Sequence, residues 1–234
     1  MCSSDLRLKA DYGREPNDQA NLTTTFNDFG LADPILRAVT ELGYREPTPI
    51  QAQAIPLVLM GRDVMGAAQT GTGKTAGFAL PILQRLMSHA NTSASPARHP
   101  VRALIIAPTR ELADQIASEM KLLSNRTSIT TVYGGVAYGK QVNALRHGTD
   151  ILVACPGRLE DLMESGTVVL DDIERVVIDE ADRMADMGFL PAVRRILDAT
   201  TARTQTILFS ATLDGDVAHL VKHYQNDPVR HEVV

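Results

Sequence analysis

Short apolar runs alternate with stretches of helical spacing along most of this chain, and that alternation constrains the fold more than any other feature. The runs hold four to six residues, are rich in Val and Ile, and end near Gly, Pro or a polar residue. This pattern is typical of strands buried on both faces of a parallel sheet. The predicted strands lie at residues 63–68, 103–107, 129–133, 151–154, 176–179 and 206–210.

Helical spacing fills the segments between the predicted strands. Strands and helices that alternate in this way form right-handed crossovers, so we expect a doubly wound α/β fold with a mostly parallel sheet sandwiched by helices. One domain should span residues 24–234, after a flexible leader at residues 1–23. The final run, 229–234, fits either a last strand or the beginning of a linker. The predicted helices lie at about residues 33–42, 51–60, 74–87, 110–124, 138–147, 157–164, 190–199 and 214–224.

Composition excludes several classes of protein. Hydrophobic residues make up 44% of the 234 residues and charged residues 22%, which excludes a mostly disordered chain. No apolar run approaches the roughly 18 residues that a membrane-spanning helix needs, so no membrane partner is expected. Two cysteines, Cys2 and Cys155, cannot form a disulfide framework, and the expected location is cytoplasmic. The net charge of −5 argues against a chain-wide basic surface for nucleic acid but leaves a local site open.

The strongest local signal is the segment AQTGTGKT, which follows a predicted strand and opens a predicted helix. Gly71 and Gly73 let the backbone curl so that successive amides face phosphate oxygens, and the helix start adds its positive dipole end. Lys74 would reach the β- and γ-phosphates of a nucleotide, and the Thr75 hydroxyl would ligate Mg²⁺. Ala68 stands where the usual GxxxxGK[ST] pattern has Gly, and a glycine-rich connection without a ligand is the alternative interpretation. The predicted nucleotide-binding residues of this segment are Ala68, Gln69, Thr70, Gly71, Thr72, Gly73, Lys74 and Thr75.

An acidic pair after another predicted strand supplies the second half of such a site. Asp179 follows three apolar residues, so it should lie at the carboxyl edge of the sheet, where open α/β folds bind ligands. Its carboxylate would hold Mg²⁺ through water, and Glu180 is placed to polarise a water that attacks the γ-phosphate. Taken alone, an acidic pair after a strand is more often the N-cap of a helix. Beside AQTGTGKT, we predict that Lys74, Asp179 and Glu180 are catalytic.

Residues 179–182 read Asp-Glu-Ala-Asp, and their spacing from AQTGTGKT resembles that of the DEAD-box ATP-dependent RNA helicases. Other segments that resemble the motifs of that family's first domain occur in the same order over about residues 24–234. The resemblance implies a RecA-like P-loop NTPase domain that uses ATP and Mg²⁺.

Residues 43–51, GYREPTPIQ, resemble the Q motif of that family, with Phe26 as the isolated aromatic residue upstream. The side-chain amide of Gln51 offers donors and an acceptor that complement the adenine N6 amino group and N7, whereas guanine presents two acceptors. The Phe26 ring would stack on the base. Without the other motifs, Gln51 would be interpreted as an ordinary first-turn residue of the helix that follows Pro-Thr-Pro.

Three further loops resemble the RNA-contacting segments of the family. The contacts that this resemblance implies are Thr109, Arg110, Gly134, Gly135 and Arg158. A hydroxyl, a guanidinium and exposed helix-start amides read phosphate rather than base sequence. Cys155 stands where the family has Thr, and a thiol is a poorer hydrogen-bond donor than a hydroxyl. Each loop alone would be interpreted as a structural turn or a solvated charge.

Residues 210–212, Ser-Ala-Thr, match motif III of the family. The hydroxyls of Ser210 and Thr212, beside Asp182 and Glu180, would tie the nucleotide state to the RNA side. The alternative is an ordinary strand end, with Thr212 or Asp214 as the N-cap of the next helix.

The sequence therefore predicts the ATP-binding domain of an ATP-dependent RNA helicase, which couples Mg²⁺-dependent ATP hydrolysis to local separation of RNA duplexes. The resemblance implies two partners: RNA, bound through its backbone, and a second RecA-like domain that supplies an arginine finger. No candidate for that domain occurs in the 234 residues, so the chain alone should be nearly inactive. The alternatives are a DNA-directed or transporter-type P-loop ATPase and a non-catalytic, nucleotide-sensing, RNA-binding scaffold.

Overall fold

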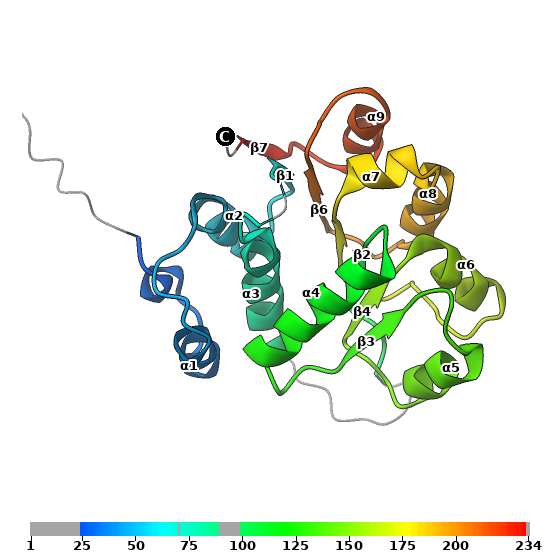
Figure 1. Ribbon diagram of the computed structural model, residues 1–234, viewed down its shortest axis with the longest axis horizontal. Coiled ribbons are helices and arrows are strands. Elements are labelled where there is room, and N and C mark those ends of the chain that lie inside the picture. The colour runs from blue at the N-terminus through cyan, green and yellow to red at the C-terminus, as the bar shows by residue number, and fades with distance from the viewer. Residues whose placement is uncertain (1–23, 70, 89–98, 233–234) are drawn as a thin grey trace, which may run out of the picture.

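A central sheet lies between two layers of helices in the computed structural model, which describes residues 24–69, 71–88 and 99–232 (Figure 1). Within those residues the sheet has seven strands, all paired in parallel, in the order β3-β4-β2-β5-β6-β1-β7. The strands are β1 (Val64–Ala67), β2 (Ala103–Ile106), β3 (Ile129–Val132), β4 (Ile151–Ala154), β5 (Arg175–Ile178), β6 (Gln205–Ser210) and β7 (Val229–Glu232). The predicted doubly wound α/β fold is confirmed.

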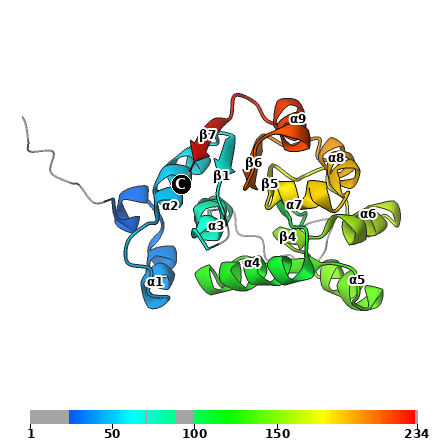
Figure 2. The same ribbon diagram turned by 45° about the horizontal axis from the view of Figure 1, so that its top comes forward.

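Helices cover both faces of this sheet, with α3 and α4 on one face and α6, α8 and α9 on the other (Figure 2). The helices are η1, a 3-10 helix (Phe26–Phe29), α1 (Asp33–Glu41), α2 (Pro49–Leu59), α3 (Lys74–Met87), α4 (Arg110–Leu123), α5 (Tyr138–Arg146), α6 (Pro156–Glu164), α7 (Ala181–Asp186), α8 (Leu190–Ala199) and α9 (Gly215–Tyr224). The predicted helices are all present. Among the described residues, the two helices that were not predicted are the shortest ones, η1 and α7, which are too short to show a helical period.

Side chains of the interior strands point alternately into two cores. On β2, Ala103 and Ile105 belong to the core that includes α1 to α4, whereas Leu104 and Ile106 belong to the core that includes α5 to α9. Burial on both faces is the reason that these strands read as continuous apolar runs. No helix in the described part of the chain is long and apolar enough to cross a membrane.

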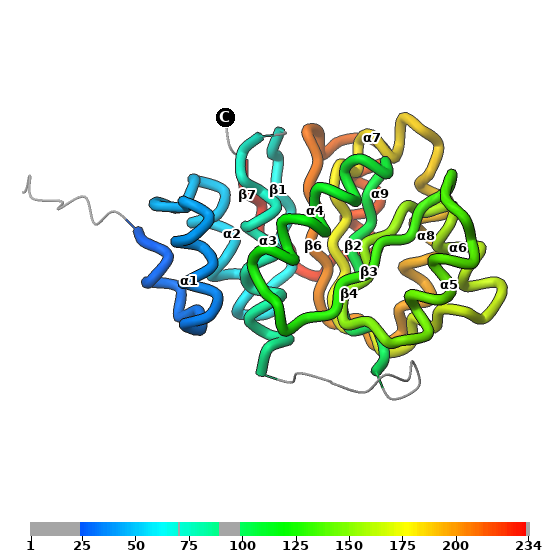
Figure 3. Tube along the Cα trace, turned by 60° about the horizontal axis from the view of Figure 1, so that its bottom comes forward, coloured from blue at the N-terminus to red at the C-terminus, as the bar shows by residue number. Residues whose placement is uncertain are grey.

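The two edge strands are more polar than the interior strands. β3 and β7 read ITTV and VRHE, and both are partly exposed. Because β7 pairs with β1, the last run is a strand rather than a linker, although residues 233 and 234 lie outside the described residues. The predicted leader, residues 1–23, also lies outside them. Figure 3 shows α1 and α2 at the end of the sheet that carries β1 and β7.

Asp63 anchors the β7 edge of the sheet. Its buried carboxylate accepts one hydrogen bond from the backbone N–H of Thr206 at 2.8 Å and another from the backbone N–H of Asn226 at 2.6 Å. One carboxylate therefore joins the start of β6 to the turn that leads into β7, next to β1.

Replacing this carboxylate should destabilise the domain. Asp63→Ala leaves two backbone N–H groups without their acceptor, so we expect the free energy of unfolding in urea to fall by roughly 2–3 kcal/mol. The matched control is Asp227→Asn, which alters an exposed ion pair with Arg62 and should change that energy by less than about 0.5 kcal/mol. Equal losses in the two variants would contradict this role of Asp63.

Candidate functional site

We call the segment AQTGTGKT, residues 68–75, the phosphate loop. It meets the predicted acidic pair, Asp179 and Glu180, at the carboxyl edge of the sheet. Lys74, the first residue of α3, places its Nζ 2.8 Å from Oδ1 of Asp179. Lys74 is 6% exposed and Asp179 is fully buried. Burial raises the pKa of the Asp179 carboxyl, and the adjacent Lys74 ammonium acts in the opposite direction. Lys74 follows β1 and Asp179 follows β5, so the pair reaches across β6, which lies between those strands.

Two glycines give the phosphate loop its curl. Gly71 has φ +84° and Gly73 has φ +80°, a left-handed conformation that residues with a Cβ rarely adopt. Gly73 is the N-cap of α3, and a Cβ on it would lie 2.6 Å from Nε2 of Gln51. The amides at the start of α3 are thereby available to an anion.

Two hydrogen bonds to backbone carbonyl oxygens hold this loop. The Thr72 hydroxyl donates to the carbonyl oxygen of Gln69 at 2.9 Å. The backbone N–H of Ala68 donates to the carbonyl oxygen of Ser210 at 3.1 Å, which ties the start of the loop to the end of β6. Thr70, also predicted to bind nucleotide, lies outside the described residues.

Gln51 joins the Q motif to the phosphate loop. It is 5% exposed in the first turn of α2; its Nε2 donates to the carbonyl oxygen of Gly73 at 3.0 Å, and its Oε1 accepts from the backbone N–H of Thr48 at 3.0 Å. Gln51 is therefore a first-turn residue, as the alternative interpretation had it. A side-chain amide has two N–H donors and two acceptor lone pairs, so one of each remains for a base.

Phe26 lies in η1 and is 5% exposed. Its ring packs against Phe29 and Tyr44, with centroids 6.0 Å and 6.4 Å away. Stacking on adenine needs an open ring face, so this role of Phe26 stays a prediction.

Glu180 has an unusual backbone conformation. Its φ of 51° is left-handed, which costs roughly 1–3 kcal/mol in a residue other than glycine and is typical of functional sites. It occupies the N-cap position of α7, but its side chain makes no capping hydrogen bond. Instead, its carboxylate lies 3.5 Å from Nη1 of Arg183. Glu180 therefore occupies the N-cap position that the alternative interpretation predicts, but its side chain does not cap the helix.

Asp179 and Thr75 fit the predicted Mg²⁺. Oδ1 of Asp179 contacts Lys74 and accepts from the backbone N–H of Glu180 at 2.9 Å. Oδ2 is buried and has no hydrogen-bond partner among the described residues. Such an oxygen is costly unless a ligand or water satisfies it, and Mg²⁺ usually keeps several waters beside one or two protein ligands. Thr75 is partly exposed, in the first turn of α3.

A cavity of about 340 Å³ opens between these segments. Ala68, Lys74, Glu180, Asp182 and Ala211 line it, so residues from the phosphate loop, the acidic tetrapeptide and the Ser-Ala-Thr segment share one space. Arg183 also lines the cavity and was not predicted. Its position three residues after Glu180 places the two side chains on one face of α7 once that helix is assigned.

The predicted coupling residues separate into two groups. The Ser210 hydroxyl oxygen accepts a hydrogen bond from the backbone N–H of Asp182 at 3.1 Å, so these two are in contact. Thr212 is exposed beyond the end of β6, and Asp214, not Thr212, occupies the N-cap position of α9.

Two of the predicted RNA-contacting loops are neighbours. Arg110 begins α4 with half of its side chain exposed, and a Cβ on Gly135 would lie 3.8 Å from its Nη1. Gly134 and Gly135 are exposed. The Thr109 hydroxyl oxygen accepts from the backbone N–H of Leu112 at 3.2 Å and so caps α4, while its own O–H remains available.

Arg158 differs from the other predicted RNA contacts because its guanidinium is turned inward. Its side chain is 14% exposed, and Nη1 donates to the carbonyl oxygen of Val136 and to Oε1 of Gln141. The contact with RNA stays a prediction.

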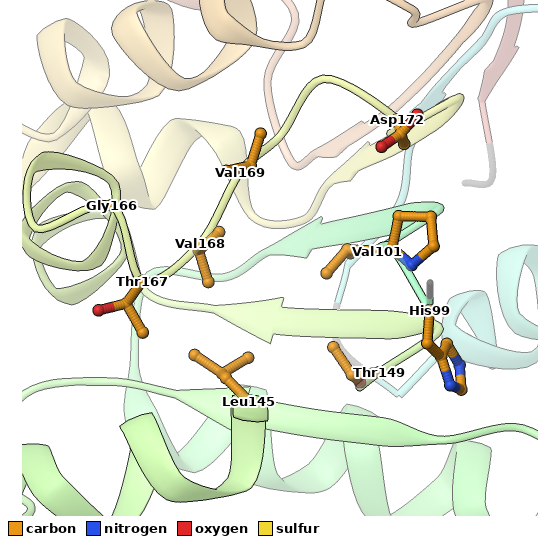
Figure 4. A pocket seen from close by; sticks show the side chains of 10 residues that line it. His99, Val101, Leu145, Thr149, Gly166, Thr167, Val168, Val169 and Asp172 are labelled. Carbon is orange, nitrogen blue, oxygen red and sulfur yellow. The ribbon is translucent and has the colours of Figure 1, made fainter. Parts of the chain in front are cut away.

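A second cavity, of about 360 Å³, lies at the opposite edge of the sheet (Figure 4). Val101, Leu145, Thr149 and Val168 line it, close to the amino ends of β2 and β4. None of the predicted site residues that the structure describes lines this cavity.

Comparison with known proteins assigns the family. The family model of the DEAD/DEAH box helicases matches residues 48–220. The chain belongs to that family. The DEAD-box ATP-dependent RNA helicase CshA of Bacillus subtilis is 39% identical over 209 residues, which cover 88% of this chain and 41% of CshA. The ATP-dependent RNA helicase DeaD of Escherichia coli is 43% identical over 212 residues, which cover 89% of this chain and 32% of DeaD. The chain thus spans less than half the length of these curated relatives.

A solved structure supports the same assignment. The crystal structure of a DEAD box protein from Methanococcus jannaschii matches 90% of this chain and 56% of its own, with a TM-score of 0.81 and 36% sequence identity. The RecA-like domain that the resemblance implied is confirmed.

Cys155 occupies the position at which the family resemblance predicts Thr. It is the N-cap residue of α6, and its side chain makes no capping hydrogen bond. Burial, with smaller contributions from Glu111 and Asp114, raises the pKa of its thiol to about 11. The thiol is therefore neutral near pH 8 and offers neither a strong hydrogen-bond donor nor an anion.

The shifted pKa predicts slow alkylation of Cys155. A rise from 9.0 to about 11 lowers the thiolate fraction at pH 8 about 100-fold, and the thiolate is the reacting form. The iodoacetamide reaction of Cys155, followed by mass spectrometry of its peptide, should be about that much slower in the native protein than in guanidinium. Equal rates in the two conditions would contradict the shift.

Proposed function

We propose that this chain, over residues 24–234, is the ATP-binding domain of an ATP-dependent RNA helicase that couples Mg²⁺-dependent ATP hydrolysis to local separation of RNA duplexes. The observation that carries the proposal is the buried pair of Lys74 and Asp179, because it joins the phosphate loop to the acidic tetrapeptide. The names of CshA and DeaD, both RNA helicases, support RNA as the nucleic acid.

Lys74 and the phosphate loop bind the triphosphate in this proposal. The β- and γ-phosphates compete with Asp179 for the Lys74 ammonium, and amides near Gly71 and Gly73 donate to phosphate oxygens. Bound Mg²⁺, held by Thr75 and through water by Asp179, would neutralise charge on the same phosphates. The cavity of about 340 Å³ supports this arrangement, since Lys74 and Ala68 line it.

Glu180 is the proposed base. Its carboxylate, 13% exposed, lines the same cavity, where it can accept a proton from the water that attacks the γ-phosphate. The left-handed backbone at Glu180 supports a catalytic role, because strained conformations persist where function requires a fixed side-chain direction.

RNA is proposed to bind across Thr109, Arg110, Gly134 and Gly135 through its backbone. The net charge of −5 gives no diffuse attraction to RNA, so these local contacts should bind weakly and salt should weaken them further. A second RecA-like domain is the second proposed partner, because hydrolysis needs further positive charge on the transferred phosphate.

Base selectivity tests the proposed role of Gln51. Gln51→Ala removes both amide contacts with adenine and should weaken ATP and ADP binding by roughly 1–3 kcal/mol, while GTP binds poorly to either protein. Gln53→Ala, at an exposed position on the same helix, is the matched control. Titration calorimetry measures the affinities of each protein for ATP, ADP and GTP. ATP and GTP binding equally well to the unaltered chain would refute the assignment.

Turnover tests the proposed function as a whole. The 234-residue chain should hydrolyse ATP near background, whereas the chain joined to a second RecA-like domain should show RNA-stimulated turnover, because an arginine finger is worth about 10³–10⁵ in rate. In the joined protein, Glu180→Gln should keep ATP binding and stop turnover. A joined protein that binds ATP and RNA without turnover would instead favour the non-catalytic sensor. Robust turnover by the chain alone would show that the catalytic groups are misassigned.

A further inference from the structure

The side chains of Gln141 and Arg158 hold the backbone on either side of Gly134 and Gly135, the two exposed glycines predicted to contact RNA. We call residues 133–136 the di-glycine loop. Nε2 of Gln141 donates to the carbonyl oxygen of Tyr133 at 2.8 Å, immediately before the glycines. Nη1 of Arg158 donates to the carbonyl oxygen of Val136 at 3.2 Å, immediately after them.

The same two side chains are bonded to each other, which closes the network. Nη1 of Arg158 also donates to Oε1 of Gln141 at 3.1 Å. Gln141 is 6% exposed, so both ends of its amide are used in an environment with little water, where hydrogen bonds are strong and unpaired groups costly. The Tyr138 ring lies against the Arg158 guanidinium, 5.4 Å from its centroid, and the Tyr138 hydroxyl is 2.8 Å from Oγ of Ser165. The guanidinium is therefore fixed on several sides.

The loop needs such support because of its composition. Glycine loses more conformational freedom on ordering than any other residue, and Gly135 has a left-handed φ of +77°. If the loop were flexible in the free protein, its loss of entropy on binding would weaken the affinity for RNA. A loop that is already ordered avoids this loss. A second tie orients the loop relative to Arg110, since the Tyr133 hydroxyl donates to Oδ1 of Asp114 at 2.8 Å, on the helix that Arg110 begins.

We propose that Gln141 is a positioning residue of the RNA-binding surface. It fixes the di-glycine loop and turns Arg158 inward, so that Arg158 acts on RNA through the loop rather than as a phosphate contact. This inference rests on the proposed function, in which the di-glycine loop contacts RNA.

Salt dependence separates a positioning residue from a phosphate contact. Each lost phosphate contact lowers the slope of log affinity against log salt concentration by about 1. A positioning residue changes the affinity but leaves the slope as it is, because the number of phosphates neutralised does not change.

The first variant is Gln141→Met, which keeps the side-chain length and removes both hydrogen bonds. In the 234-residue chain, the backbone N–H order parameters of Gly135 and Val136 should fall below about 0.6, the range of flexible backbone. Affinity for a short single-stranded oligouridylate should fall several-fold with an unchanged salt slope, and ADP affinity should stay the same. The control, Asn143→Met, replaces an exposed amide on the same helix and should change none of these quantities.

The second variant, Arg158→Met, removes a positive charge and so distinguishes the two roles of Arg158. Positioning predicts a lower backbone order parameter at Val136, weaker oligouridylate binding and an unchanged salt slope. A slope smaller by about 1, with the order parameter unchanged, would show that Arg158 contacts phosphate directly and would overturn that part of the inference.

Two results would overturn the role of Gln141. One is an unchanged set of backbone order parameters in the di-glycine loop of Gln141→Met. The other is a loss of ADP affinity and of thermal stability in parallel with RNA affinity, which would mark Gln141 as merely structural. The order parameters are measured without RNA, so a lack of oligouridylate binding by the unaltered chain would contradict the proposed function while the order parameters still decide whether Gln141 positions the loop.

Discussion

Two opposite charges, on Lys74 and Asp179, lie 2.8 Å apart where almost no water reaches them. Removing either partner would leave the other charge buried and uncompensated, which is strongly destabilising, although a buried pair adds little net stability. The role of the pair is to position two segments. It brings the start of α3 and the end of β5 to one point at the carboxyl edge of the sheet. Any phosphate that binds must compete with Asp179 for Lys74, so ligand binding and the state of the acidic tetrapeptide are linked.

Ser210 extends this link across the sheet. It ends β6, the strand between β1 and β5. Its carbonyl oxygen accepts from the backbone N–H of Ala68 in the phosphate loop, and its hydroxyl oxygen accepts from the backbone N–H of Asp182 in the tetrapeptide. One buried serine thus contacts both halves of the site. Ser210 therefore links the two halves of the proposed nucleotide site to the segment that follows β6.

The sequence predicts those parts of this structure that depend on local pattern. Continuous apolar runs predict the interior strands, because those strands are buried on both faces. The closely spaced Gly71 and Gly73 predict the turn of the phosphate loop, and both have a positive φ in the structure. Three features depend on tertiary contacts and escape such patterns: the burial of Phe26 against Tyr44, the strained φ of Glu180 and the inward turn of Arg158. A guanidinium in a Pro-Gly-Arg segment at the start of a helix is interpreted as solvated or RNA-facing until Gln141, 17 residues earlier, is placed beside it.

We propose that Asp179 and the phosphate loop form one Mg²⁺-dependent nucleotide site. The most direct test is calorimetric titration of the 234-residue chain with ATP, with and without Mg²⁺, beside Asp179→Asn, which keeps the side-chain shape and removes the charge. We expect Mg²⁺ to tighten ATP binding by about tenfold or more in the unaltered chain, which is about 1.4 kcal/mol. In Asp179→Asn that is shown by circular dichroism to be folded, the gain should vanish while Mg²⁺-free binding persists. An undiminished gain from Mg²⁺ in the folded variant would show that Asp179 does not hold the ion.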